Sequence, residues 1–366
     1  MTHILKTVWL IINLIASAAL LLSGYGGHIN PGTWPIGGIA LMIFPVLLAG
    51  MLLIILIDIV VWRRLAFVPT FAVLICAPAI WSICPLNINS SKPTDGSREI
   101  SVMTYNVMAF NQPPENILYT GINPTLSTII AGDADIVCLQ ESRAIFDNAG
   151  WAPKEQFDTI VSRYPYISMK LSMAILSKFP IDTIPMPDSG DPTALFMCAR
   201  ADVDGTDVMV YNLHLQSIGL SPEDKQLYDN LTSKPTTHRI EDGRGLISKL
   251  SQAMKKRSEQ AQMVRQAIDS IGGDHILVCG DFNDIEGCYA ERLIAGKQLH
   301  SLYTSVGVGP VITYYVNRFY FNIDHILYGS LEPLDYKCLR VKASDHYAVT
   351  GKLSLPTNVQ PKNHRP

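Results

Sequence analysis

The N-terminal quarter of the chain is far more apolar than the remainder. No Asp, Glu, Lys or Arg occurs from Thr7 to Ile57, and a second uncharged run extends from Leu65 to Ser91. A membrane-spanning helix needs about 20 apolar residues to cover the hydrocarbon core of a bilayer. The pattern therefore predicts an all-α transmembrane region over residues 1–89. Its three helices are expected at about residues 4–22, 36–57 and 65–83.

A signal peptide followed by a hydrophobic core is the alternative interpretation of this region. A signal peptide carries one apolar run and a small-residue cleavage site, whereas three apolar runs occur here. Pro45, Pro69 and Pro78 fall inside the expected helices, and membrane helices tolerate proline better than soluble helices do. The transmembrane interpretation is therefore favoured.

The few basic residues of this region predict its orientation. Lys6 lies at the start of the first apolar run, and Arg63 and Arg64 lie between the second and third helices. The loop between the first two helices has neither Lys nor Arg. Basic loops stay in the cytoplasm, so three crossings would carry everything after Lys92 to the other side. We expect an integral protein of the inner or plasma membrane whose soluble domain is extracytoplasmic.

Short apolar strands alternate with helical stretches after a polar linker at residues 90–97. Residues 195–203 and 348–355 are typical of strands, and residues 245–271 carry apolar side chains at helical spacing. Many short strands with helices between them predict an α/β or α+β layered domain. We place this domain at residues 98–356 and a tail at residues 357–366.

Charge and cysteine content exclude several classes of protein. Residues 96–366 hold 30 acidic and 25 basic residues, a net charge of −5, which is a poor basis for tight non-specific binding to DNA. Lys255, Lys256 and Arg257 form the densest basic run, and we expect it to be the solvated face of a helix. The seven cysteines show no spacing typical of zinc ligands, so neither a zinc site nor a disulfide framework is predicted.

Candidate chemistry appears as polar residues at the ends of apolar strands, where layered folds commonly place their functional groups. Any one of these residues alone is more often a strand end that meets water or a turn. Six such motifs occur along the chain, and their order carries the signal. They are Thr104-Tyr105-Asn106, Gln140-Glu141, Asn212-Leu213-His214, Gly280-Asp281-Phe282-Asn283, Ile323-Asp324-His325 and Ser344-Asp345-His346.

This ordered set resembles the endonuclease/exonuclease/phosphatase superfamily, which includes abasic-site endonucleases, DNase I, inositol-polyphosphate 5-phosphatases and bacterial sphingomyelinases. The resemblance extends from Glu99 to about Leu355. It implies a four-layered α/β sandwich, in which two facing mixed β-sheets are covered by outer helices. It also implies hydrolysis of a phosphoester bond with a divalent metal, Mg²⁺ or Mn²⁺, and no other cofactor.

The resemblance further implies which side chains would hold the metal. Glu141 would be its anchoring carboxylate, because Mg²⁺ prefers oxygen ligands and retains several waters. Asn106 would help to position the metal or the phosphate. Asp345 would complete the acidic cluster as a second ligand or through a bound water. Some nucleases of the family carry an Asp two residues after the first Asn, where this chain has Met108, so a second carboxylate on that strand is in doubt.

The remaining roles implied by the resemblance concern the attacking water and the phosphate. Asp281 and Asn283 would hold and activate the water, with Asp281 as general base. His214 and His346 would donate hydrogen bonds to phosphate oxygens, and Asp324 would orient His346. The loop at residues 110–124 is rich in Asn and Pro, and we expect it to shape the mouth of the site.

Two functional hypotheses follow. The first is a membrane-anchored phosphodiesterase, nuclease or phosphatase whose substrate is a nucleic acid or a phospholipid headgroup. Membrane attachment favours a lipid substrate, as in sphingomyelinase-like or phosphoinositide-phosphatase-like enzymes, and the acidic charge balance disfavours long duplex DNA. The second is a non-catalytic membrane scaffold of the same fold, which would have no physical need for the full polar set. No obligate protein partner is predicted.

Overall fold

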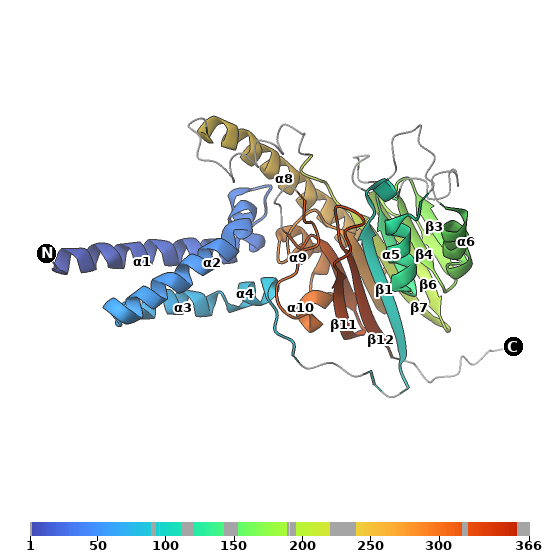
Figure 1. The fold of residues 1–366 in the computed structure, drawn as a ribbon, viewed down its shortest axis with the longest axis horizontal. Coiled ribbons are helices and arrows are strands. Elements are labelled where there is room, and N and C mark those ends of the chain that lie inside the picture. The colour runs from blue at the N-terminus through green and yellow to red at the C-terminus, as the bar shows by residue number, and fades with distance from the viewer. Residues whose placement is uncertain are drawn as a thin grey trace.

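The computed structural model describes most of the chain (Figure 1). The described residues are 2–88, 93–94, 96–111, 121–142, 153–188, 190, 195–219, 239–316 and 321–356. The predicted tail at residues 357–366 lies outside them, as do residues 112–120 of the predicted mouth loop and four residues of the predicted linker.

Two long helices, α1 (Thr2–Gly24) and α2 (Ile36–Val61), extend side by side away from the rest of the molecule (Figure 1). Both are long and apolar enough to cross a membrane, and both are exposed over most of their length, unlike the core helices of a soluble protein. The buried carboxylate of Asp58 joins them: it accepts hydrogen bonds from Trp9 Nε1 at 2.6 Å and from Asn13 Nδ2 at 2.8 Å.

The third predicted helix is divided into two short ones, α3 (Phe67–Ile75) and α4 (Ala77–Ile83). The break falls at Cys76, whose backbone (φ −78°, ψ 5°) departs from the helical region. Pro78 explains it, because proline has no N–H for the carbonyl of Leu74 and its ring crowds that carbonyl. Residues 65–83 therefore do not form one continuous helix. The two shorter helices, α3 and α4, still run back towards the soluble domain (Figure 1).

The soluble domain is built on two six-stranded mixed sheets. In the first, the strand order is β11 (Glu332–Leu339), β12 (Ala348–Leu355), β1 (Arg98–Asn106), β2 (Ile136–Gln140), β4 (Met173–Ser177) and β3 (Tyr166–Lys170). In the second, it is β5 (Ile181–Ile184), β6 (Leu195–Val203), β7 (Thr206–His214), β8 (His275–Asp281), β10 (Asp324–Gly329) and β9 (His300–Ser301). Only two strand pairs in these sheets are parallel, β1 with β2 and β7 with β8.

The sheets and helices form the predicted four-layered α/β sandwich. One apolar core lies between the two sheets and includes Val102, Ile175, Val210 and Leu277. A second lies under α8 (Arg239–Ile271) and α9 (Tyr289–Ala295), and a third under α5 (Pro124–Gly132) and α6 (Lys154–Arg163). Short helical turns η1 (Gly26–His28), η2 (Met108–Asn111) and α10 (Leu302–Val306) complete the described elements.

Two buried amides hold the sheets together beneath one edge. The Nε2 atom of Gln140, on β2, donates to Oδ1 of Asn212, on β7, at 2.7 Å. Asn212 in turn donates through Nδ2 to the carbonyls of Leu139 and Ala174, both at 3.0 Å. Both amide side chains are fully buried, and a buried polar group is costly unless it is hydrogen-bonded. The pairing therefore fixes how the ends of β2 and β7 face each other.

The prediction for the basic run on α8 is wrong for one of its three residues. Lys255 and Lys256 are exposed, but Arg257 is 1% exposed and pairs through Nε with Oδ2 of Asp284 at 3.0 Å. Residue 257 is three positions after Met254 and four before Ala261, so it shares their inward face of the helix. The helical period, rather than the charge, decides its environment.

Candidate active site

The two parallel strand pairs end at one edge of the sandwich, and the predicted site residues meet there. β1 ends at Asn106, β7 ends at His214 and β8 ends at Asp281. Glu141 follows β2 directly, and β10 begins at Asp324. Because the C-terminal ends of parallel neighbours lie at the same sheet edge, residues far apart in sequence become adjacent. Asn283, Asp345 and His346 reach the same edge from the loops that follow β8 and precede β12.

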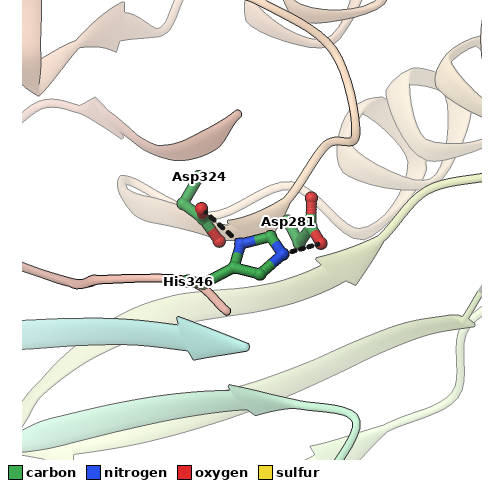
Figure 2. A group of neighbouring side chains, drawn as sticks. All are labelled: Asp281, Asp324 and His346. Atoms are coloured by element: carbon green, nitrogen blue, oxygen red, sulfur yellow. Dashed lines mark hydrogen bonds and ion pairs between the residues drawn. The ribbon is translucent and has the colours of Figure 1, made fainter. Parts of the chain in front are cut away.

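A chain of three buried side chains lies at its centre (Figure 2). Nδ1 of His346 lies 2.8 Å from Oδ2 of Asp324, and Nε2 of the same ring lies 3.7 Å from Oδ2 of Asp281. The first contact is a hydrogen bond and fixes which nitrogen faces the cavity. The second is too long for one, which leaves Nε2 of the ring directed at the cavity edge.

Oδ2 of Asp281 is the point on which several donors converge. Asn106 Nδ2 donates to it at 3.0 Å and also lies 3.1 Å from Oε1 of Glu141. Nε2 of His214 lies 3.8 Å from the same Asp281 oxygen and 3.9 Å from Oε1 of Glu141. Two imidazoles and one amide therefore surround a carboxylate that is 1% exposed.

Backbone geometry sets the direction of Glu141 and Asn283. Both have φ of 51°, in the left-handed region where non-glycine residues are uncommon. The Asn283 N–H donates to Oδ1 of Asp281 at 2.8 Å, and its Nδ2 donates to the carbonyl of Leu215 at 3.0 Å. These bonds hold Asn283 beside Asp281 with its amide nitrogen already engaged, so the oxygen of the amide is the atom with capacity for a further partner.

Asp345 is held by the residue before it. Ser344 Oγ lies 2.8 Å from the carbonyl oxygen of Asn106 and 3.1 Å from Oδ1 of Asp345. The pKa of Asp345 is raised, first by burial, while the positive charge of His346 lowers it and the negative charge of Glu141 raises it. The last effect means that Asp345 and Glu141 lie close enough to repel each other, which a cation between them would relieve.

The protonation state of His346 follows from the same geometry. Burial lowers the pKa of His346, but the carboxylates of Asp324 and Asp281 and the hydrogen bond that the ring donates to Asp324 outweigh burial and raise it to about 10. The ring is therefore an imidazolium at neutral pH. It presents a positive charge and an N–H donor at the cavity, which is suited to an anionic group.

A cavity of about 390 Å³ opens over this cluster. Its polar side is formed by Glu141, Asp281, Asn283, Asp345 and His346. The predicted residues Asn106, His214 and Asp324 do not line it and act from behind, through Asp281, Glu141 and His346. The volume is within the range of roughly 300–1,000 Å³ that is typical of small-molecule sites.

The donor set suits a hard divalent cation. Glu141 and Asp345 offer carboxylate oxygens, which Mg²⁺ prefers, and no cysteine is among the described residues that line the cavity. Nδ2 of Asn106 faces Glu141, and Oδ1 of Asn106 accepts a hydrogen bond from the Met108 N–H at 3.1 Å. Asp281, Asp324 and His346 also have ligand atoms within 4.8 Å of one another. Nδ1 of His346 is already bonded to Asp324, however, so this trio is better described as a hydrogen-bonded chain than as a ligand set.

The sequence profile of the endonuclease/exonuclease/phosphatase family matches residues 103–346. This match spans two thirds of the chain and includes all six motifs. The chain belongs to this family. Its members are phosphoester hydrolases. Residues 5–83 match a second profile, described only as a domain of unknown function. No curated protein matches the chain.

Solved structures of similar fold include three from bacteria. An endonuclease/exonuclease/phosphatase from Beutenbergia cavernae is 17% identical over 70% of this chain and 72% of its own, with a TM-score of 0.45. A family protein from Bacteroides thetaiotaomicron is 17% identical over 71% of this chain and 99% of its own, with a TM-score of 0.44. Beta toxin from Staphylococcus aureus is 15% identical over 69% of this chain and 99% of its own, with a TM-score of 0.42.

Two residues of the site escape sequence reasoning. Ser344, which ties the loop before β12 to Asn106, lies inside a recognised motif but carries no signal of its own. Met42, on α2, lines the cavity although it lies far from every motif and inside a predicted membrane helix. A lone Met in an apolar run is typical of any membrane helix, so only the packing of α2 on the soluble domain reveals it.

Proposed function

We propose that this protein is a membrane-anchored, divalent-metal-dependent phosphoester hydrolase. The observation that carries the proposal is the convergence of His346, His214 and Asn106 on one buried oxygen of Asp281. A hydrolase needs a proton acceptor for water beside positive donors for an anion, and this arrangement supplies both within one cavity. A scaffold of the same fold would gain nothing from burying such a set, because burying charge is costly.

We assign the metal to Glu141, with Asp345 as a further oxygen ligand and Asn106 as the residue that helps to position Glu141 beside it. The oxygen donor set and the repulsion between Glu141 and Asp345 support this assignment. Mg²⁺ or Mn²⁺ bound there would supply a positive charge that polarises the phosphoryl group.

The residues of the chain take the remaining roles. A bond forms between the oxygen of water and phosphorus, and the bond from phosphorus to the leaving oxygen breaks. Asp281 accepts the proton of the water, which Asn283 helps to orient. His346 donates a hydrogen bond to a non-bridging oxygen, where negative charge grows in the transition state. His214 lies behind the cavity and faces the carboxylates of Asp281 and Glu141. Asp324 keeps His346 oriented and charged, and the leaving oxygen takes up a proton from solvent.

We assign the soluble domain to the extracytoplasmic side of the membrane. In Figure 1, α1 runs towards the soluble domain, α2 runs away from it, and the α3–α4 pair runs back towards it. Arg63 and Arg64 lie between the end of α2 and the start of α3, and this turn is distant from the soluble domain. This alternation supports three crossings. Basic loops remain in the cytoplasm, so the distant end is the cytoplasmic one.

The test uses the full chain in detergent with bis-p-nitrophenyl phosphate as substrate. We expect release of p-nitrophenol with Mg²⁺ or Mn²⁺ and no release with EDTA. Folded protein that turns over neither this ester nor any of a panel of DNA, RNA, phosphoinositide and sphingomyelin would contradict the proposal.

A further inference from the structure

The N-terminal region contributes a wall to the catalytic cavity. Met42, on α2, lines the same 390 Å³ cavity as Asp281 and His346. Met42 also packs against the apolar core that lies under α8, together with the cavity residue Phe321. The site is therefore incomplete without the region that carries the membrane helices.

The segment that leads into Met42 packs closely on the soluble domain. Its neighbour Leu41 is 3% exposed and belongs to the core of the second sheet. Gly38 lies so close to α8 that a Cβ there would be 2.7 Å from Sδ of Met254. Gly27 lies even closer to the soluble domain, where a Cβ would be 1.9 Å from the carbonyl oxygen of Gly287. The backbone contact leaves no room for a Cβ at Gly27, and both contacts show how closely η1 and the start of α2 pack on the soluble domain.

The wall that Met42 belongs to is apolar. Ile285 and Ile323 are buried core residues at the cavity, and Phe321 is partly buried beside them. They line the same cavity as the charged side chains of Asp281 and His346. A phosphate needs only the charged wall, so the apolar wall fits a hydrophobic part of the substrate.

The cavity lies at the level where α2 would enter a bilayer. Ile43, next to Met42, is 49% exposed and Val46 is 73% exposed, so α2 presents apolar surface beside the cavity. α2 ends at Val61, and about 20 residues cross the hydrocarbon core. Counting back by that length from Val61 reaches Met42, which places the apolar wall at the edge of the hydrocarbon.

We propose that the substrate is a lipid phosphoester, which enters from the bilayer along α2. Its phosphate would lie against Asp281 and His346, and the first methylenes of its chain would lie against Met42, Ile285 and Phe321. This inference rests on the proposed hydrolase function and adds the class of substrate and the residue of the membrane region that selects it.

The test measures how the rate depends on the alkyl chain alone. The full-length protein in lipid nanodiscs is assayed with methyl, butyl and octyl p-nitrophenyl phosphate, each below its critical micelle concentration. All three esters release p-nitrophenol, so the leaving group is constant. Each methylene buried is worth up to about fourfold in kcat/KM. We expect a gain of at least about tenfold from methyl to octyl. Equal kcat/KM for all three esters would overturn the inference while leaving the hydrolase function intact.

Two variants of α2 test whether this helix is responsible for the gain in kcat/KM from the methyl to the octyl ester. Met42→Gln, of similar size but polar, is expected to reduce the gain from methyl to octyl by about tenfold. Ile43→Gln, on the outward side of the same helix, is expected to keep the wild-type gain. Partition of the octyl ester into the disc is the same for all three proteins, so it does not account for a difference. A wild-type gain in Met42→Gln would overturn the role of α2.

Two further outcomes are decisive. Faster turnover of thymidine p-nitrophenyl phosphate than of the octyl ester would overturn the lipid assignment in favour of a nucleotide. Absence of turnover on every ester would refute the hydrolase function on which the inference rests. The wild-type series is informative even if Met42→Gln fails to fold.

Discussion

Nδ1 of His346 and Oδ2 of Asp324 lie 2.8 Å apart, and both side chains are almost completely buried. The bond joins the loop before β12 to the first residue of β10, which belong to different sheets. Nδ1 of His346 carries a proton that it donates to Asp324, and Nε2 is therefore directed towards the cavity. Burial of a charge is tolerated here because the pair is hydrogen-bonded. The pair thus supplies both the orientation and the charge of the imidazolium.

Asp324→Asn is the first variant to examine. The amide retains the shape of the carboxylate but removes the charge that keeps His346 protonated, so we expect kcat to fall by about 10²-fold with little change in KM. Steady-state kinetics on bis-p-nitrophenyl phosphate measure kcat and KM of the variant. Asp335→Asn, at an exposed ion pair with Lys337 on β11, is the matched control and should be near normal. A normal kcat in Asp324→Asn would remove its positioning role.

Asp281→Asn tests the proton acceptor. An amide does not accept the proton of the attacking water, so kcat should fall by roughly 10²- to 10⁴-fold. Asp207→Asn changes an exposed carboxylate near the start of β7, at the other end of the same sheet, and should leave the rate unchanged. Circular dichroism of both variants establishes that the fold is retained. A rate within about threefold of wild type would exclude Asp281 as the base.

Glu141→Gln tests the metal assignment. Loss of the anchoring carboxylate should raise the Mg²⁺ concentration for half-maximal activity by about tenfold or more, and excess Mg²⁺ should restore part of the rate. Titration of activity with Mg²⁺ after EDTA treatment measures this. Glu155→Gln, at an exposed site on α6, should titrate as wild type does. An unaltered titration of Glu141→Gln would place the metal elsewhere.

A second buried cluster predicts how stability depends on pH. Nδ1 of His325 lies 2.8 Å from Oε2 of Glu286, and Nε2 lies 2.8 Å from the carbonyl oxygen of Asp284. Burial lowers the pKa of His325, but the charge of Glu286 outweighs burial and raises it to about 10. Burial also raises the pKa of Glu291 in this cluster, to about 8.

The sign of the effect follows from the raised pKa of His325. The folded state binds the proton more tightly than the unfolded state, whose histidine has a pKa of about 6.5. The stabilisation is complete below pH 6.5 and is lost as pH rises through about 10. We expect the melting temperature of the full chain in detergent to fall between pH 8 and pH 10, and to fall less in His325→Gln. His300→Gln, at an exposed site on β9, should match wild type. If the melting temperature fell equally with pH in wild type and in His325→Gln, the result would contradict the charged state of His325.

The orientation in the membrane is tested with reporters. Alkaline phosphatase fused after residue 356 should be active, because it folds only outside the cytoplasm and three crossings would deliver it there. The same enzyme fused at Arg64 should be inactive. The reverse pair of results would place the soluble domain in the cytoplasm.

Much of the fold could be predicted from the sequence because its signals are local. Residues 195–203 and 348–355 were expected to be strands and form β6 and β12 with the same bounds. The motif residues were also found from the sequence, since each lies where an apolar strand meets polar chain. Strand β9, with two residues, and the mostly exposed strand β5 lack a periodic apolar pattern and could not be predicted in this way.

The sequence by itself determined that the chain has a long apolar N-terminal region, a layered domain and six ordered polar motifs. Those properties depend on composition and on the period of side chains along the chain. Only the tertiary structure decided that Arg257 is buried, that Nε2 of His346 faces the cavity, and that Met42 of α2 forms a wall of the site. Such facts depend on contacts between segments distant in sequence, and no local pattern specifies which face of α2 packs on the domain that follows it.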